Sequence, residues 1–283
     1  MLNSMAGADM QMQARRHAEL GLRWLDLKDG LFGQTINNLG VDNAHRVAAI
    51  AHQHGLGVAS LSTALCASEL EVGEAAFRRR HDATLDHVLA LANILRPRTI
   101  RLISAVLKPF PGGAHVMDAV ERDQPWVFGV YADMVDRIDA AGFQTLIENE
   151  PDNMILATPE GILRFFERVD RPGKVKYTWD IQNLWEAGVY PTLAVYRQLK
   201  PLIGCIHLKG GRTDGDGRKL VHASSLEDAS WPVLDIVRAV VADRVAPIIC
   251  LNPSHGKKPP GFDIWEVAQR DIAFLRQHVS ATL

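Results

Sequence analysis

The sequence predicts an α/β fold of the (β/α)8 type, a TIM barrel, and three observations lead to this prediction. Segments with strand character alternate with segments of helical periodicity along the chain, which is typical of a parallel sheet covered by helices. The links from helix to strand are short and those from strand to helix are long, as in a barrel whose site is built from the βα loops. The sequence lacks the glycine-rich phosphate turn that marks most open doubly wound sheets.

The expected strands are runs of apolar, β-branched and aromatic residues, which favour an extended, half-buried backbone. They cover residues 22–27 (LRWLDL), 56–62 (LGVASLS), 99–105 (TIRLISA), 143–148 (FQTLIE), 175–180 (VKYTWD), 203–208 (IGCIHL) and 246–252 (APIICLN).

The expected helices carry apolar residues at helical spacing. They cover residues 12–21, 43–54, 74–94, 126–141, 159–169, 192–199, 231–241 and 264–279. Start signals precede two of them. Asp42 or Asn43 stands before the helix at 43–54, and Thr158-Pro159-Glu160 supplies an N-cap, a proline at the first helical position and an acid in the first turn.

The first nine residues do not fit the alternating pattern. The strand that should precede the helix at 12–21 would lie in MLNSMAGAD, which has poor strand character. We therefore expect a barrel whose first strand is missing or atypical, or whose true start lies upstream of Met1. No linker rich in Pro, Gly or Ser divides the chain, so we expect a single barrel domain over residues 1–283, with residues 1–9 poorly ordered or atypical.

Composition narrows the class of protein. The chain has 283 residues, of which 47% are hydrophobic and 23% are charged, and its formal net charge of -2 gives no electrostatic case for binding nucleic acid. No apolar run approaches the roughly 20 residues of a membrane span, and the start lacks the apolar segment of a signal peptide. Three widely spaced cysteines are expected to be reduced thiols, so we expect a cytoplasmic protein with no membrane partner.

Polar side chains end four consecutive strands of the expected barrel. These residues are Glu148, Asp180, His207 and Asn252. In a parallel barrel the carboxyl ends of the strands converge on one mouth, and alternation along each strand directs these side chains inward. Two carboxylates, an imidazole and an amide oxygen suit a divalent cation such as Mn²⁺, Mg²⁺ or Co²⁺. The alternative is a polar mouth that binds no metal.

Three of these strand ends lie in motifs that resemble a known family. The segments LIENEP at 146–151, YTWDIQNLWEAGVYP at 177–191 and IHLKG at 206–210 resemble those of the xylose isomerase-like barrel superfamily, in its sugar phosphate isomerase/epimerase group. The resemblance runs from about Leu22 to the end of the chain. It implies that Glu148, Asp180 and His207 are metal ligands.

Two departures from the family pattern bear on substrate and mechanism. The family has a histidine three residues after the aspartate, usually in contact with substrate, where this chain has Asn183. The family's fourth ligand is a glutamate, where this chain has Asn252. An amide oxygen can still bind a hard cation but cannot take up a proton at working pH. In the sugar epimerases of this group the first and last glutamates act as paired acid and base groups on opposite faces of the substrate. The resemblance therefore implies that this pair is incomplete here.

The catalytic candidates that remain are Glu148 or Glu150 as the base, with Lys209, His222 or His255 as the opposite partner. Lys209 could polarise a carbonyl, hold a carboxylate or phosphate, or simply be a solvated loop lysine.

Other side chains are candidates for contact with a substrate. Arg101, Asp26 and Lys28 could each bind substrate or form an ion pair inside the barrel, whereas Cys205 and Cys250 are expected to be core residues. The candidate substrate-binding residues are Asn183, Trp185, Arg212 in the loop at 210–217, His255 and Arg101.

The family resemblance and the strand ends together predict a metal-dependent isomerase or epimerase of a small sugar, keto-sugar or polyol. A carboxylate would remove a proton beside a metal-bound carbonyl and form an enediolate. Mn²⁺ is the expected ion, with Mg²⁺, Co²⁺ or Zn²⁺ as alternatives. The alternative functions are a dehydratase or other lyase on a similar substrate, and a degenerate barrel that binds a small molecule or a partner chain. Because an incomplete barrel leaves a sheet edge exposed, we also expect a homo-oligomer.

Overall fold

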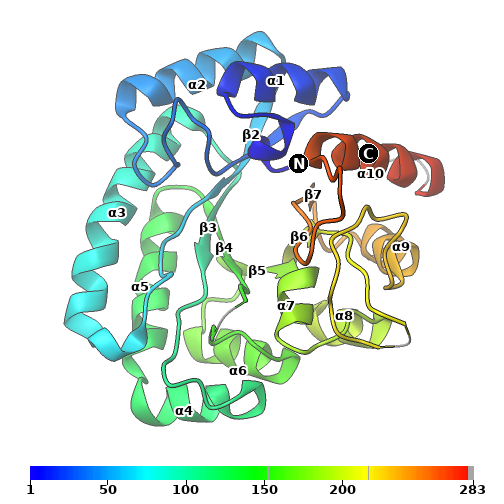
Figure 1. Ribbon diagram of the computed structural model, residues 1–283. Helices are drawn as coiled ribbons and strands as arrows, with labels where there is room; N and C mark the ends of the chain where they lie inside the picture. Colours follow the sequence, from blue (N-terminus) through cyan, green and yellow to red (C-terminus); the bar gives the residue numbers. More distant parts are fainter. Residues whose placement is uncertain (152, 216, 280–283) are drawn as a thin grey trace.

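Seven parallel strands form one sheet in the computed structural model, which describes residues 1–151, 153–215 and 217–279. The strands follow one another in chain order, and the sheet curls into a nearly closed barrel with the helices outside it (Figure 1). They are β1 (Trp24–Leu27), β2 (Gly57–Ser62), β3 (Thr99–Ile103), β4 (Gln144–Glu148), β5 (Val175–Asp180), β6 (Ile203–Leu208) and β7 (Ile248–Leu251). The predicted α/β barrel is confirmed.

The predicted helices are present in the described part of the chain, with ends that shift by a few residues. The observed α-helices are α1 (Met10–Glu19), α2 (Val41–Gln53), α3 (Glu74–Leu95), α4 (Val116–Asp123), α5 (Trp126–Ala140), α6 (Pro159–Val169), α7 (Ile181–Glu186), α8 (Leu193–Leu199), α9 (Val233–Asp243) and α10 (Ile264–His278). Two of them, α4 and α7, were not predicted. Both lie in βα connections, and α7 is too short to show a periodic pattern.

The helix start signals have different outcomes. Thr158 is the N-cap of α6, where its side chain accepts a hydrogen bond from the backbone N–H of Gly161. The prediction for α2 is wrong, because that helix begins at Val41 with Gly40 at the N-cap position. Asp42 lies inside the first turn, where an acidic side chain still interacts favourably with the helix dipole.

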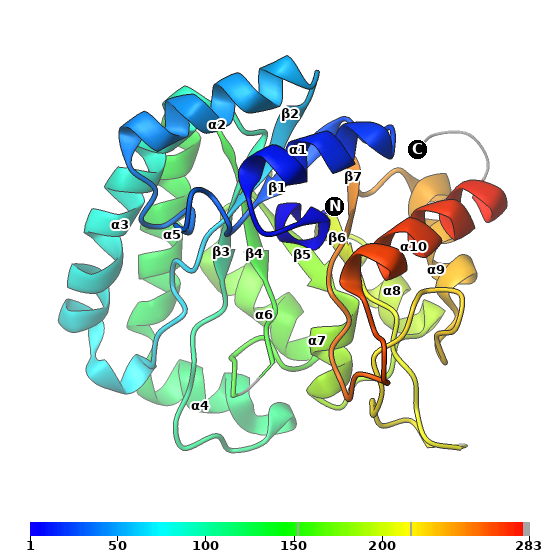
Figure 2. The ribbon, with the colours of Figure 1, turned by 45° about the horizontal axis from the view of Figure 1, so that its top comes forward.

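Residues at the beginning of the chain occupy the position of the expected first strand. Leu2 forms a parallel bridge with Asp26 of β1, and its backbone N–H donates to the Leu251 carbonyl of β7 at 2.9 Å. The 3-10 helix η1 (Asn3–Ala6) follows, and Met1, Leu2 and Met5 are buried. Figure 2 shows this segment lying between β1 and β7. The first strand is therefore atypical, and residues 1–6 pack against the barrel.

This local cover bears on the predicted oligomer. The expectation rested on an exposed seam between the first and last strands, and Leu2 bridges that seam with backbone contacts to both of them. A homo-oligomer stays a prediction, but an exposed sheet edge no longer argues for it.

Apolar side chains on the outer face of the sheet pack against the helices. Trp179 of β5 is buried and stacks on Tyr196 of α8, with the ring centroids 6.3 Å apart. Trp179 therefore points outward from the barrel, toward the helices. Because its neighbour Asp180 points to the other side of the strand, the sheet separates an apolar outer layer from a polar interior.

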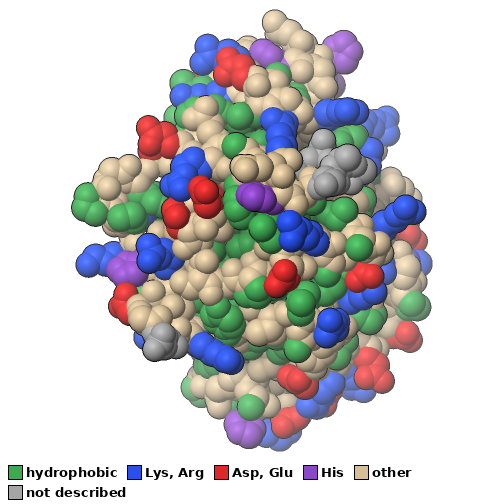
Figure 3. All heavy atoms as spheres, turned by 90° about the vertical axis from the view of Figure 1, so that its right-hand side faces the viewer, with side chains coloured by type: hydrophobic (Ala, Val, Ile, Leu, Met, Phe, Trp, Pro, Cys, Tyr) green, Lys and Arg blue, Asp and Glu red, His purple; other side chains and the backbone are tan. Residues whose placement is uncertain are grey.

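The surface carries both signs of charge. On the face shown in Figure 3, basic and acidic side chains are interspersed. Exposed ion pairs such as Arg270 with Glu227, at 3.0 Å, each contribute only about 0–1 kcal/mol to stability. None of the helices in the described residues combines the length and apolar character that crossing a bilayer requires.

Candidate metal centre

Three of the four predicted ligands converge at the carboxyl ends of β4, β5 and β6. One ligand atom each from Glu148, Asp180 and His207 lies within 4.8 Å of the other two. His207 Nδ1 is 2.6 Å from Glu148 Oε1 and 3.7 Å from Asp180 Oδ2. All three side chains are buried. The parallel register produces this arrangement, because Asp180 is paired directly with His207 across β5 and β6.

Lys209 reaches into the same group of side chains from just beyond β6. Its ammonium lies 2.6 Å from Asp180 Oδ2 and donates to Asn183 Oδ1 at 2.8 Å. It also lies 2.8 Å from Nε2 of His255. Since an ammonium can only donate, Nε2 of His255 accepts. Lys209 is buried, so it is not a solvated loop lysine.

Arg101 of β3 lies inside the barrel and forms an ion pair with Glu148 Oε2. It also donates to the backbone carbonyl of Thr63 at 2.8 Å, and its side chain is only 3% exposed. Glu148 therefore has one carboxylate oxygen on the Arg101 guanidinium and the other on the His207 ring. Of the two predicted possibilities for Arg101, the structure shows the interior ion pair.

These contacts set the protonation of the carboxyl groups and of His207. Burial would raise the pKa of the Asp180 carboxyl, but the Lys209 ammonium and His207 together outweigh burial and hold this pKa below its usual range. Burial would likewise lower the pKa of His207, but the Glu148 carboxylate and the contacts with Asp180 and Asp26 together outweigh it and raise this pKa well above the usual value. Burial, reinforced by the charge of Glu148, raises the pKa of Glu150 to about 7.

A network of amide side chains holds the strand ends in place. Asn149 accepts from the backbone N–H of Asp180 at 3.0 Å and from the Tyr177 hydroxyl at 2.6 Å, and it donates to the Asp180 carbonyl at 2.9 Å. Asn183 donates to the Asn149 carbonyl at 3.1 Å and to Glu150 Oε2 at 3.0 Å. No role was predicted for Asn149, although its place directly after Glu148 was the available signal.

Asp180 also determines where α7 begins. Its Oδ1 accepts from the backbone N–H groups of Gln182 and Asn183, at 3.1 and 2.9 Å, and so caps the helix. Its Oδ2 faces Lys209 and His207. One carboxylate thus serves the helix with one oxygen and the candidate site with the other.

The remaining candidate residues contact neighbours other than the three ligands, or are exposed. Asn252 follows β7, with its amide oxygen 3.7 Å from Cys250 Sγ. Trp185 is buried, and its indole N–H donates to the Arg218 carbonyl at 2.6 Å. His222 contacts Asp214 Oδ1 at 2.8 Å. Arg212 is exposed in the loop at 210–217, of which position 216 lies outside the described residues.

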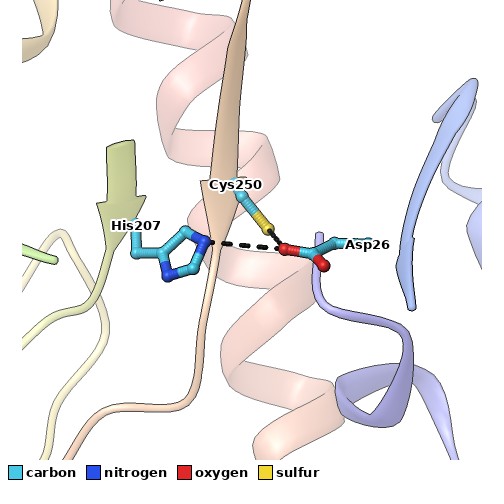
Figure 4. A group of neighbouring side chains, drawn as sticks. All are labelled: Asp26, His207 and Cys250. Atoms are coloured by element: carbon cyan, nitrogen blue, oxygen red, sulfur yellow. Dashed lines mark hydrogen bonds and ion pairs between the residues drawn. The ribbon is translucent and has the colours of Figure 1, made fainter. Parts of the chain in front are cut away.

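Asp26 and Cys250 lie on the Nε2 side of the His207 ring, away from Glu148 and Asp180 (Figure 4). Asp26 Oδ2 lies 3.5 Å from His207 Nε2 and 3.4 Å from Cys250 Sγ. The hydrogen bond and charge of His207 outweigh the effect of burial and lower the pKa of Asp26 to about 2. Cys250 is buried, and burial raises the pKa of its thiol to about 12, in agreement with a core residue rather than a nucleophile.

Comparison with known proteins assigns the chain to a family. A family model described as the xylose isomerase-like TIM barrel matches residues 14–277. The chain belongs to this family. The match covers β1 to β7 and therefore contains every candidate ligand. No curated protein sequence matches the chain significantly.

Solved structures with the same fold superpose along nearly the whole chain. A probable 3-DHS dehydratase from Bacillus anthracis is 17% identical, with a TM-score of 0.68 over 93% of this chain and 91% of the other. A xylose isomerase-like protein from Mycobacterium smegmatis in complex with magnesium is 16% identical, with a TM-score of 0.67 over 94% and 87%. A D-psicose 3-epimerase with D-tagatose from Clostridium cellulolyticum H10 is 14% identical, with a TM-score of 0.68 over 99% of both chains. At these identities the likeness shows the fold alone.

Proposed function

We propose that the protein is a divalent-metal-dependent isomerase or epimerase of a small sugar, keto-sugar or polyol. The observation that carries this proposal is the buried group of Glu148, Asp180 and His207, whose ligand atoms lie within 4.8 Å of one another. Two carboxylates and an imidazole fit a divalent cation such as Mn²⁺. Family membership and the sugar epimerases among the similar structures support the class of reaction.

Glu148, Asp180 and His207 would hold the metal, with the amide oxygen of Asn252 as the proposed fourth ligand. When bound, such an ion polarises a substrate carbonyl and stabilises the negative charge that follows removal of the neighbouring proton. The buried setting of the site strengthens these electrostatic interactions by excluding water.

Glu150 is the proposed base. Both oxygens of Glu148 are already engaged, by Arg101 and by His207, which suits a ligand better than a proton acceptor. Glu150 is half-buried, with one oxygen held 3.0 Å from the Asn183 amide nitrogen. Its carboxylate is therefore oriented but still accessible, as a group that removes a proton must be.

Lys209 is the proposed opposite partner, and Asn183 and His255 are the proposed contacts to substrate oxygens. The ammonium of Lys209 touches both of these residues, at 2.8 Å each, so a substrate oxygen bound there would meet all three. Arg212 belongs to a neighbouring loop that can add a contact at the rim. Arg101 and Trp185 are buried and engaged with other residues, Arg101 in the ion pair with Glu148 and Trp185 in the hydrogen bond to Arg218. Their proposed role is to hold the residues of the site in place, and not to bind the substrate.

A dehydratase or other lyase is the second candidate, favoured by the unequal chemistry of the two partners. An epimerase needs groups that exchange protons on both faces of the substrate, and the family's second glutamate is Asn252 here. A carboxylate base opposite an ammonium suits removal of a proton and protonation of a departing hydroxyl.

A solvent-exchange experiment tests the proposal and separates the two candidates. Protein purified without chelator is expected to carry about one divalent ion per chain, and keto-sugars incubated with it and Mn²⁺ in D₂O are expected to gain deuterium beside the carbonyl. Replacing Glu150 by glutamine should slow the exchange by about 10²- to 10⁴-fold and leave the metal content unchanged. Loss of water from the substrate would identify the lyase. A protein that binds sugar but neither exchanges nor eliminates would be the degenerate barrel.

Restoring a carboxylate at position 252 should strengthen the site. Asn252→Glu is expected to tighten Mn²⁺ binding by at least roughly tenfold, because a charged oxygen replaces a neutral one. Without metal the same variant should be less stable, since the added charge is buried. Calorimetric titration and thermal unfolding with and without Mn²⁺ measure both effects. Unchanged affinity with Asn252→Glu would place residue 252 outside the ligand set, and Asn252→Gln is the matched neutral control.

A further inference from the structure

A carboxylate approaches the candidate metal ligand His207 from the side of β1. Asp26 lies on β1, with its side chain turned into the barrel and only 4% exposed. Its Oδ2 is 3.5 Å from Nε2 of His207. Figure 4 shows this contact reaching the ring from the side of β1. The function proposed above gives Asp26 no part.

The two nitrogens of His207 face different partners. Nδ1 points to Glu148 Oε1, at 2.6 Å, and to Asp180 Oδ2, at 3.7 Å, so this nitrogen faces the candidate metal position. Nε2 points away from that position and toward Asp26. A neutral imidazole that binds a metal through Nδ1 carries its proton on Nε2, and an acceptor beside Nε2 stabilises that tautomer.

Asp26 is itself held in place by the barrel. The Ser62 hydroxyl of β2 donates to its Oδ1. The thiol of Cys250 on β7 lies 3.4 Å from Oδ2. Contacts from the strands on both sides of β1 therefore fix the carboxylate, which can restrain the ring in turn.

We propose that Asp26 is the positioning residue of the metal centre: it accepts the Nε2–H of His207 and so presents Nδ1 to the ion. This inference rests on the proposed metal-dependent function and deepens it. The contact links β1 to a centre whose ligands come from β4, β5 and β6, so closure of the barrel is part of building the site.

Metal affinity of matched variants tests the role of Asp26. Asp26→Asn is expected to bind Co²⁺ or Mn²⁺ about 10- to 100-fold more weakly than the wild type, the usual effect of altering such a partner, because the amide is uncharged and has only one acceptor oxygen to divide between Ser62 and His207. Asparagine is preferred to alanine because Asp26 borders a cavity of about 220 Å³, which truncation would enlarge. Ser62→Ala should weaken binding less, since it only loosens Asp26. Ser60→Ala is the control, because Ser60 is the register partner of Asp26 on the neighbouring strand. This variant should bind the metal as the wild type does.

A spectroscopic signature separates positioning from a general loss of stability. The proton NMR spectrum of the Co²⁺ protein should contain a hyperfine-shifted, solvent-exchangeable signal from Nε2–H of His207. That proton should exchange faster with water in Asp26→Asn, whose folding is checked by circular dichroism. A mere structural defect would lower occupancy without changing the exchange rate in the molecules that remain loaded.

Three outcomes would overturn the proposal. Wild-type affinity and an unchanged exchange rate in Asp26→Asn would remove the role of Asp26 and leave the metal centre intact. A second bound ion that disappears in Cys250→Ala would show that Asp26, His207 and Cys250 bind metal themselves. A wild-type protein that binds no metal at all would reject the proposed function, and this inference with it.

Discussion

Replacing Asp180 by asparagine is expected to abolish stoichiometric metal binding, with a loss of affinity of roughly 100-fold or more, while the fold persists. The substitution removes the negative charge of Oδ2, which faces His207 and Lys209. The amide can keep an oxygen where Oδ1 caps α7 through the N–H groups of Gln182 and Asn183. Elemental analysis, calorimetric titration with Mn²⁺ and the melting temperature measure the three consequences.

The comparison with Asp180→Ala separates the two duties of this carboxylate. Alanine removes the charge and the cap together, so it should lose metal and also be about 1 kcal/mol less stable than Asp180→Asn, which keeps an oxygen at the cap. Asp263→Asn is the matched control, because Asp263 caps α10 in the same way, through Trp265 and Glu266. It should change neither metal content nor activity. If Asp180→Asn still bound Mn²⁺ as the wild type does, Asp180 would not be a ligand.

Replacing Arg101 by methionine is expected to lower the free energy of unfolding by about 3–5 kcal/mol. The guanidinium pairs with Glu148 inside the barrel, where the two side chains are 3% and 1% exposed. Removing the guanidinium leaves the buried Glu148 carboxylate with His207 as its remaining ionic partner, and losing a buried charge partner costs far more than losing an exposed pair. Chemical denaturation measured on metal-free protein gives the value.

A double-mutant cycle shows whether the loss comes from the unpaired charge. Glu148→Leu alone should destabilise the protein by a similar amount, and Arg101→Met with Glu148→Leu should recover most of the stability, because neither charge is then left alone. Arg98→Met is the control. Arg98 is an exposed residue whose guanidinium lies 3.8 Å from the centre of the Trp24 ring, a contact of only about 0.5–1 kcal/mol. Additive losses in the double variant would show that the two residues are not energetically coupled.

The electrostatic setting explains why these two substitutions should have the largest effects. Asp180 and Glu148 each meet a cation of the chain, Lys209 and Arg101 respectively. The carboxylates are therefore compensated in the folded protein even without a metal ion. Asp180→Asn leaves Lys209 without its carboxylate partner. Arg101→Met leaves Glu148 without its guanidinium partner.

The sequence by itself determined the order of the elements and the nature of the strand ends. Strand and helix character depend on residues a few positions apart, and a strand such as β5 can be recognised from its own residues at 175–180. Placement at consecutive strand ends was enough to select Glu148, Asp180 and His207, because parallel strands in chain order bring those ends together. The short helix α7 was not predicted, since its 6 residues are too few to show a periodic pattern and its cap, Asp180, is also the last residue of a strand.

Only the tertiary structure decided how the polar residues are paired. Arg101 meets Glu148 and Asp26 meets His207 across the interior of the barrel, and both partnerships depend on sheet register and closure rather than on distance along the sequence. Lys209 turned out to be a buried partner of Asp180 because the chain after β6 continues toward the mouth. Met1 and Leu2 fill the seam between β1 and β7 with backbone hydrogen bonds: the Met1 carbonyl accepts from Asp26, and the Leu2 N–H donates to Leu251. Such bonds do not depend on a strand-like run of side chains. Local periodicity therefore specified the barrel, and long-range packing specified the contacts inside it.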